Sequence, residues 1–293
     1  MKPAKFDYFA ASTVKEAVDA LAAGPEAHIL AGGQSLVPMM NLRLAQPKVL
    51  VDINRIKDLN FIEVSPNILR LGGLCRHRSV ELSLEVRQRV PLLAKASALI
   101  GHVGIRNRGT LGGVVAHADP ASEVPAALVA LNAIINVTGP SSQRRIAATD
   151  FFTGYFSNSL DPTEMVTSIE ISTDNRTSGQ AFVEFTRRAG DYALVGVAAI
   201  VERSPTSACV AVRLVACGVA DRPVDLSDAA ISLIGESSVS DTIARQIGNE
   251  VSRRLQPGTD VHASATDRLE LAQLLAIEGL RRALAQTVKE KTQ

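Results

Sequence analysis

Apolar residues near the start of the chain recur at intervals of three and four, the spacing of one face of an α-helix. The apolar positions of this segment are Val14, Ala17, Val18 and Leu21. Thr13 and Glu16 form a capping box at its start, and Gly24-Pro25 stops it. The pattern therefore predicts a first helix that begins directly after Thr13.

Short apolar runs bounded by turn residues follow this helix and predict strands. The run at 28–31 breaks into two glycines and then into a segment with Pro38 in its first turn, which favours a short helix. Pro66-Asn67 separates two further runs, an arrangement typical of a hairpin. The expected strands are 28–31, 49–52, 62–64, 68–71 and 133–137, and the expected helices are 36–40, 92–100 and 125–131.

The chain becomes richer in β-formers from residue 165 onwards. Turn residues such as Ser204-Pro205 separate the later apolar segments, which favours an antiparallel meander. These segments are 181–187, 192–202 and 208–216. Helical spacing returns from Asp225 to the end, and a polar run without periodicity at 172–179 marks the main predicted domain boundary.

Composition narrows the class of protein. The chain has 293 residues, a formal net charge of +1, only eight Phe and three Tyr, and no basic run, so a nucleic-acid groove has no support. No segment has the length and apolar character of a membrane span or a secretion signal. Cys75, Cys209 and Cys217 are too few and too scattered for an iron–sulfur cluster or a zinc site, and we expect reduced thiols, no bound metal and a cytoplasmic protein.

Two glycine-containing loops are the candidate ligand-binding motifs. Residues 31–35 lie between a predicted strand and a predicted helix, and the paired glycines let backbone N–H groups approach a phosphate. Gln34 and Ser35 add side-chain donors, and Thr110 does so in a second loop at 109–113. Two such loops indicate a ligand with two phosphates, or with a phosphate and a ribityl or ribose group. Tight structural turns are the alternative, since neither loop is a dinucleotide fingerprint or a P-loop.

Four segments together resemble one known family. The sequences are AGGQSLVP at 31–38, IRNRGTLGG at 105–113, DPASEVP at 119–125 and RRAGDYA at 187–193. In the same order, they are similar to the A-G-G-H/Q-S-L-x-P, I-R-N-x-G-T-I-G-G, D-P-x-S-D-x-P and R-R-x-G-D-Y/F-A segments of the FAD-binding (medium) subunits of molybdenum hydroxylases. This is the xanthine dehydrogenase and carbon monoxide dehydrogenase medium-chain family.

The resemblance implies an α+β fold in two domains. Residues 1–175 would form a two-part FAD-binding domain of the PCMH type, like that of vanillyl-alcohol oxidase, with subdomains at about 1–55 and 56–175. Residues 176–293 would form a domain like the C-terminal domain of the CO dehydrogenase flavoprotein. We expect this second domain to be a three-stranded antiparallel sheet with helices.

The resemblance also implies roles for residues at the cofactor site. The first loop would surround the FAD pyrophosphate, and the second would close on it from the other side. Glu123, where Asp is usual, would contact the sugar-like part of the flavin, and Tyr192 would cover one face of the ring system. Ile100 would lie near the adenine, with simple core packing as the alternative. The implied cofactor-binding residues are Leu30, Ala31, Gly32, Gly33, Gln34, Ser35, Leu36, Ile100, Thr110, Leu111, Gly112, Gly113, Val114, Glu123, Val166 and Tyr192.

One position departs from the family pattern. Val114 follows Gly113 where the family has Asn, so one side-chain contact to the cofactor is missing. We expect weaker FAD retention, or compensation by Gln34 or His117. His77 and His117 lie near the loops, but electron transfer through a flavin needs no strong general base. We therefore expect no catalytic side chain, and we favour structural roles for both histidines.

By this resemblance, electrons leave a substrate at a molybdenum-pterin centre on a large partner subunit. They pass through 2Fe-2S clusters on a small partner subunit to FAD on this chain, and then to NAD, a quinone or another carrier. The expected assembly is a heterotrimer or a dimer of heterotrimers. Two alternatives stay open: a stand-alone flavin oxidoreductase of the related two-loop fold, and a non-catalytic assembly subunit whose FAD site has decayed.

Overall fold

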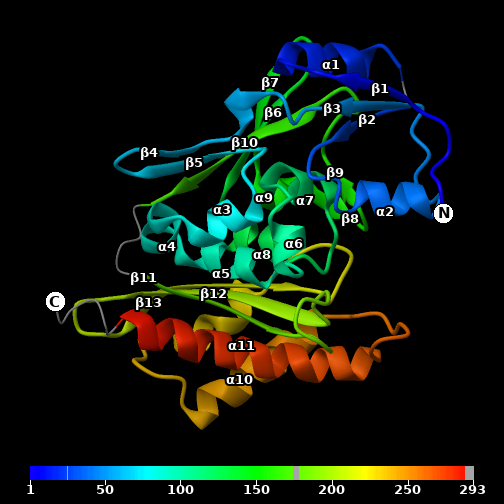
Figure 1. Cartoon of the computed structure of the whole chain (residues 1–293). Helices are drawn as coiled ribbons and strands as arrows, with labels where there is room; N and C mark the ends of the chain where they lie inside the picture. Colours follow the sequence, from blue (N-terminus) through cyan, green and yellow to red (C-terminus); the bar gives the residue numbers. More distant parts are fainter. Residues whose placement is uncertain (25, 174–177, 288–293) are drawn as a thin grey trace.

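The computed structural model describes residues 1–24, 26–173 and 178–287. Figure 1 shows a stack in which two sheets lie above a layer of helices, followed by a third sheet and two long helices. Pro25, and the middle of the predicted boundary at 172–179, lie outside the described residues. None of the helices within the described ranges combines the length and the apolar character that a membrane span requires.

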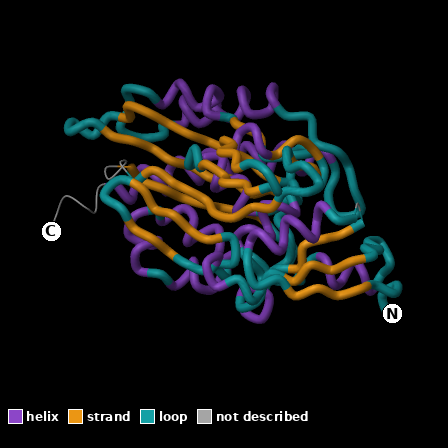
Figure 2. Tube along the Cα trace, turned by 90° about the horizontal axis from the view of Figure 1, so that it is seen from above, coloured by secondary structure: helices purple, strands orange, loops and turns teal. Residues whose placement is uncertain are grey.

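The first layer is a small parallel sheet with strand order β1-β3-β2. Its strands are β1 (Asp7–Ala10), β2 (Ala27–Leu30) and β3 (Val49–Asp52), and its helices are α1 (Val14–Ala22) and α2 (Leu36–Asn41). The predicted cap of α1 is confirmed, because the Thr13 hydroxyl accepts from the Glu16 backbone N–H at 3.1 Å. The Glu16 carboxylate accepts from the Ser12 backbone N–H at 2.7 Å. Figure 2 shows this sheet beside the N-terminus, at one edge of the molecule.

The second layer is an antiparallel sheet with strand order β4-β5-β10-β6-β7. Its strands are β4 (Ile62–Val64), β5 (Ile68–Gly72), β6 (Ile134–Thr138), β7 (Gln143–Ala147) and β10 (Met165–Ser172). Although β10 opens the β-rich part of the chain, it pairs with strands far earlier in the sequence: Ile169 lies opposite Leu71 on one side and Ile135 on the other. The predicted hairpin around Pro66-Asn67 joins β4 to β5.

Helices and short segments fill the space below this sheet. They are α3 (His77–Leu82), α4 (Leu84–Arg89), α5 (Pro91–Leu99), α6 (Val103–Arg106), α7 (Leu111–His117), α8 (Glu123–Ala130), α9 (Ala148–Phe151), β8 (Phe152–Gly154) and β9 (Ser157–Asn158). The short η1 (Lys57–Leu59) packs against the first layer instead, since Leu59 belongs to the apolar cluster of Val18 and Val51. The helix predicted at 125–131 begins two residues earlier, so that Pro125 lies in its first turn. Every residue of α8 is buried, because the helix is enclosed between the two sheets.

The third sheet is antiparallel, as predicted, but a short fourth strand extends the three that were expected, and the strand order is β11-β12-β13-β14. Its strands are β11 (Ser178–Phe185), β12 (Val195–Arg203), β13 (Cys209–Cys217) and the two-residue β14 (Val224–Asp225). The elements η2 (Ser227–Leu233), α10 (Asp241–Arg254) and α11 (Ala265–Thr287) follow. Alternate residues face opposite ways: Phe182 packs into the core around α5 and α8, whereas Val183 packs against α11. Helices on both faces explain why the sequence of β12 is almost uniformly apolar.

Candidate cofactor-binding site

A cavity of about 760 Å³ lies where the three layers meet, within the ~300–1,000 Å³ range of small-molecule pockets. Most of the residues that the resemblance implies for cofactor binding line this cavity: Ala31, Gly32, Gly33, Gln34, Ser35, Leu36, Ile100, Thr110, Gly112, Gly113, Val114, Glu123, Val166 and Tyr192. Two predicted residues do not line it. Leu111 is fully buried in the core beneath the second loop, and Leu30 lines a neighbouring hollow of about 360 Å³.

The first glycine loop joins β2 to α2 and offers hydrogen-bond donors. Gly33 adopts φ +71°, a conformation that glycine tolerates without strain. No described residue accepts a hydrogen bond from the backbone N–H groups of Gly33, Gln34 or Ser35. The Gln34 amide donates to the Gly32 carbonyl at 3.1 Å, which fixes the loop from within. Three neighbouring amide groups are thus available to a ligand in the cavity.

The second loop differs from the sequence prediction, because its amide groups are already used. The Gly112 N–H donates to the Gly73 carbonyl at 2.8 Å, and the Gly113 N–H donates to the Thr110 hydroxyl at 3.1 Å. A Cβ at Gly112 would lie 2.8 Å from the Gly73 oxygen. The missing side chain at Gly112 therefore serves close packing of the protein on itself, and the loop supplies the Thr110 hydroxyl and a rigid wall.

The two loops also touch each other. A Cβ at Gly32 would lie 2.8 Å from the Gly109 Cα. Arg76 donates to the Arg108 carbonyl and, through Nη2, to the Asn54 side chain at 2.8 Å. Asn54 in turn donates to the Ala31 carbonyl at 2.8 Å. Asn54 and Arg76 hold the loops together, and sequence reasoning missed both because no local pattern marks them.

Glu123 places a buried carboxyl group at the wall of the cavity, and the charges of Glu184 and Asp119 act on it. Glu123 begins α8 and is only 3% exposed. Burial, with the nearby charges of Glu184 and Asp119, raises its pKa to about 8. Burial also raises the pKa of Glu184 on β11 to about 7, and that of Asp119 above its ordinary value. Glu123 is therefore mostly protonated at neutral pH, when it can both donate and accept a hydrogen bond.

The two nearby histidines are not equivalent. His77 packs under the second loop, where a Cβ at Gly109 would lie 2.8 Å from its ring. Burial, with the charges of Arg106 and Arg76, lowers the pKa of His77 to about 4, so this ring is neutral. Burial also lowers the pKa of His117, whose ring lies 5.2 Å from that of Phe156. These surroundings favour a packing role for His77.

Tyr192 lies on the connection between β11 and β12, at the mouth of the cavity, and is 59% exposed. Burial of the hydroxyl and the charges of Asp119 and Glu123 raise its pKa, while a side-chain hydrogen bond with Ser35 acts in the opposite direction. Tyr192 therefore reaches the first loop. The tip of the same connection touches the segment after α5, since a Cβ at Gly190 would lie 3.2 Å from the Gly101 carbonyl carbon. Ile100 and Tyr192 thus line the same end of the cavity.

Comparisons with known proteins agree across nearly the whole chain. Residues 4–173 match the family described as FAD binding domain in molybdopterin dehydrogenase, and residues 180–283 match the CO dehydrogenase flavoprotein C-terminal domain. The 6-hydroxypseudooxynicotine dehydrogenase complex subunit alpha of Paenarthrobacter nicotinovorans is 38% identical over 285 residues, covering 97% of this chain and 96% of the relative. The glyceraldehyde dehydrogenase medium chain of Sulfolobus acidocaldarius is 34% identical, covering 96% and 99%.

Solved structures show the same relationship. A chain of carbon monoxide dehydrogenase from Hydrogenophaga pseudoflava superposes with a TM-score of 0.93 at 32% identity, covering 98% of this chain and 99% of that one. A chain of quinoline 2-oxidoreductase from Pseudomonas putida 86 gives a TM-score of 0.93 at 33% identity, with the same coverage.

Proposed function

We propose, from the premise that this chain belongs to the FAD-binding medium subunits of the molybdenum hydroxylases, that it passes electrons from 2Fe-2S clusters of a small partner subunit to an acceptor. The chain binds FAD and is an oxidoreductase subunit of a multi-subunit complex. FAD supplies the redox chemistry, and the protein supplies binding, orientation and the local field. Acceptors of the right class are NAD, a quinone or another carrier.

The first loop carries this proposal. Its three neighbouring backbone N–H groups have no acceptor among the described residues and line a cavity of suitable size. Such a nest of N–H groups fits the pyrophosphate of FAD. We propose that the second loop backs this nest through Thr110 and through its close contact with Gly32, rather than by donating its glycine amides.

The flavin end of the cofactor is assigned to the end of the cavity that Tyr192 covers. Ile100 lines that same end, because Gly101 and Gly190 are in contact. We therefore propose that Ile100 contacts the flavin rather than the adenine. The Glu123 carboxyl group would hydrogen-bond the sugar-like part of the flavin. Val114 lines the cavity with an apolar side chain at the position where the family has Asn.

The proposed assembly contains a large molybdopterin-binding subunit and a small 2Fe-2S subunit, as a cytoplasmic heterotrimer or a dimer of heterotrimers. The medium-chain names of several relatives support it. We further propose that residues 1–175 and 176–293 act as the FAD-binding and C-terminal domains. Family matches that end at 173 and begin again at 180 support this division.

The test is to purify the chain alone and together with its co-purifying subunits. The proposal expects about one FAD per chain in both samples, and flavin reduction by substrate only when the partners are present. Substrate turnover by the isolated chain would favour a stand-alone flavin oxidoreductase instead. A colourless chain that still assembles with its partners would favour the non-catalytic assembly subunit.

A further inference from the structure

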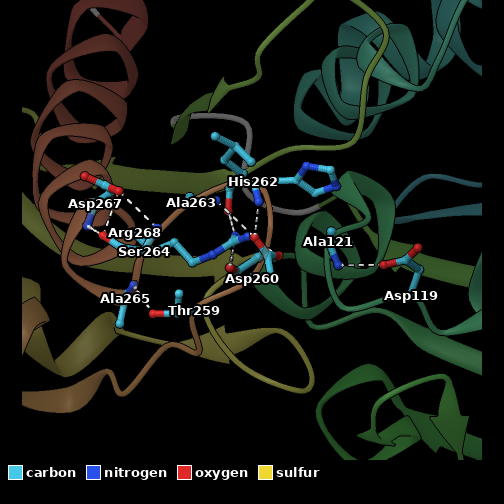
Figure 3. Close-up of polar contacts among 12 residues, drawn as sticks. Asp119, Ala121, Thr259, Asp260, His262, Ala263, Ser264, Ala265, Asp267 and Arg268 are labelled. Carbon is cyan, nitrogen blue, oxygen red and sulfur yellow. Dashed lines mark hydrogen bonds and ion pairs between the residues drawn. The ribbon is translucent and has the colours of Figure 1, made fainter.

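Arg268 carries a nearly buried charge in the first turn of α11, and it is 8% exposed. Its Nη1 donates to two backbone carbonyls, that of Leu194 and, at 2.8 Å, that of Gly218. Its Nη2 pairs with the Asp260 carboxylate at 2.7 Å. Figure 3 shows this side chain extending from α11 to Asp260. The fixed fork of a guanidinium suits three acceptors in different directions, which a lysine cannot match.

The Leu194 carbonyl lies at the base of the connection that carries Tyr192. The Leu194 N–H donates to the Phe185 carbonyl at 2.9 Å and closes the excursion of residues 186–193 between β11 and β12. The tip of this excursion rests against Gly101. A hydrogen bond to the Leu194 carbonyl therefore fixes the base of the connection that carries Tyr192.

The Gly218 carbonyl connects Arg268 to a second segment beside the cavity, residues 118–123. The Gly218 N–H donates to the Pro120 carbonyl at 2.9 Å, and Pro120 lies in the turn that leads into α8 and Glu123. Gly218 has φ +77°, and a Cβ there would lie 3.0 Å from the Leu194 carbonyl carbon. One guanidinium thus ties the Tyr192 connection and the turn at Pro120 to the same point.

The position of Arg268 is electrostatically unfavourable in two ways. The first turn of a helix repels a positive charge, and a buried guanidinium has lost its water. Asp260 compensates: partial burial raises its pKa, but hydrogen bonds from the His262 and Ala263 backbone and the charge of Arg268 outweigh this and hold it below the ordinary value. The contacts of Arg268 with the Leu194 and Gly218 carbonyls and with Asp260 offset these two penalties.

We propose that Arg268 is a positioning residue for the flavin end of the cofactor site, acting through the Leu194 and Gly218 carbonyls on the segments 186–194 and 118–123. This inference rests on the proposed function, because it assumes that Tyr192 and Glu123 contact FAD. The C-terminal domain then contributes to the cofactor site through Arg268 as well as through the connection that carries Tyr192.

The experiment compares Arg268→Gln, Arg268→Lys and Asp260→Asn with the wild-type chain. Arg282→Gln is the matched control, because Arg282 lies on the same helix, has a side chain that is 60% exposed, and pairs with Glu278. Hydrogen exchange of the chain without FAD is measured by mass spectrometry for 186–194 and 118–123, with α1 as the internal reference. FAD affinity and the fluorescence of bound flavin are measured alongside.

We expect faster exchange in both segments for the two Arg268 variants, a smaller effect for Asp260→Asn, and none for Arg282→Gln or in α1. We also expect about tenfold weaker FAD binding and brighter flavin fluorescence, because Tyr192 no longer quenches it. Unchanged exchange in both segments would overturn the inference, as would an equal rise everywhere including α1. If Arg268→Gln does not fold, Asp260→Asn decides by the same criteria. Failure of wild-type protein to bind FAD would count against the proposed function alone, since the exchange comparison needs no cofactor.

Discussion

Replacing Glu123 by glutamine tests the electrostatics of the cofactor site without changing its shape. The carboxyl group lies at the start of α8, nearly enclosed, with Glu184 and Asp119 close enough to disfavour its charge. The amide has the same size and no charge at any pH. The substitution therefore isolates the free energy of burying this one negative charge.

The magnitude follows from the pKa of Glu123. A rise from 4.5 to about 8 corresponds to about 5 kcal/mol at ~1.4 kcal/mol per unit, which is an upper bound. Between these two values the folded chain retains a proton that the unfolded chain has released. The free energy of unfolding therefore falls as pH rises through this window, and the loss is complete above about pH 8.

The assay is thermal unfolding of the chain without FAD from pH 5 to pH 9. We expect Glu123→Gln to differ little from wild type at pH 5 and to unfold up to about 8 °C higher at pH 9, since ~0.6 kcal/mol shifts the Tm of a chain of this length by about 1 °C. Glu278→Gln, an exposed carboxyl on α11, is the control and should follow wild type throughout. If the Glu123→Gln curve stays parallel to the wild-type curve over the whole range, the buried-charge reasoning is refuted.

Further predictions concern the loops and the flavin contact. Gly32→Ala places a methyl group against the backbone of the second loop, so FAD content should fall by more than half; Gly258→Ala, which meets no atom within 4 Å, should retain full content by absorbance. Tyr192→Ala should raise bound-flavin fluorescence and change the rate of flavin reoxidation while leaving FAD content nearly unchanged, whereas exposed Tyr155→Ala should alter neither. Val114→Asn should tighten FAD binding about threefold to tenfold in titrations by adding an amide donor to the cavity wall; equal or weaker affinity would contradict the role assigned to this position.

Local patterns predicted local structure well in this chain. The strand at Val49–Asp52, the hairpin around Pro66-Asn67 and the cap at Thr13 depend on neighbouring residues, and the structure confirms all three. The pairing of β10 with β5 and β6 depends on residues far away in the sequence, which no local pattern contains. The two-residue β14 is too short to produce a periodic signal.

The candidate site was predictable where the motifs are contiguous and not where contacts come from distant segments. Both loops and Tyr192 line one cavity, as the resemblance implied. The sequence alone could not explain why position 112 is glycine, because it does not reveal that Gly73 packs against this residue. Asn54 and Arg268 act through backbone carbonyls, and a carbonyl acceptor leaves no trace in the identity of the residue that carries it.

The two faces of the third sheet have a consequence for how this chain can be altered. Phe182 and Cys217 belong to the same apolar interior as Leu92 and Leu128, so the segments on either side of residue 175 share one interior. Without the other segment, each would expose part of this apolar interior to water. We therefore expect the chain to denature in a single transition. A chimaera that joins the N-terminal part of one relative to the C-terminal part of another must therefore exchange the interior residues of both parts together, even though the two family matches divide there.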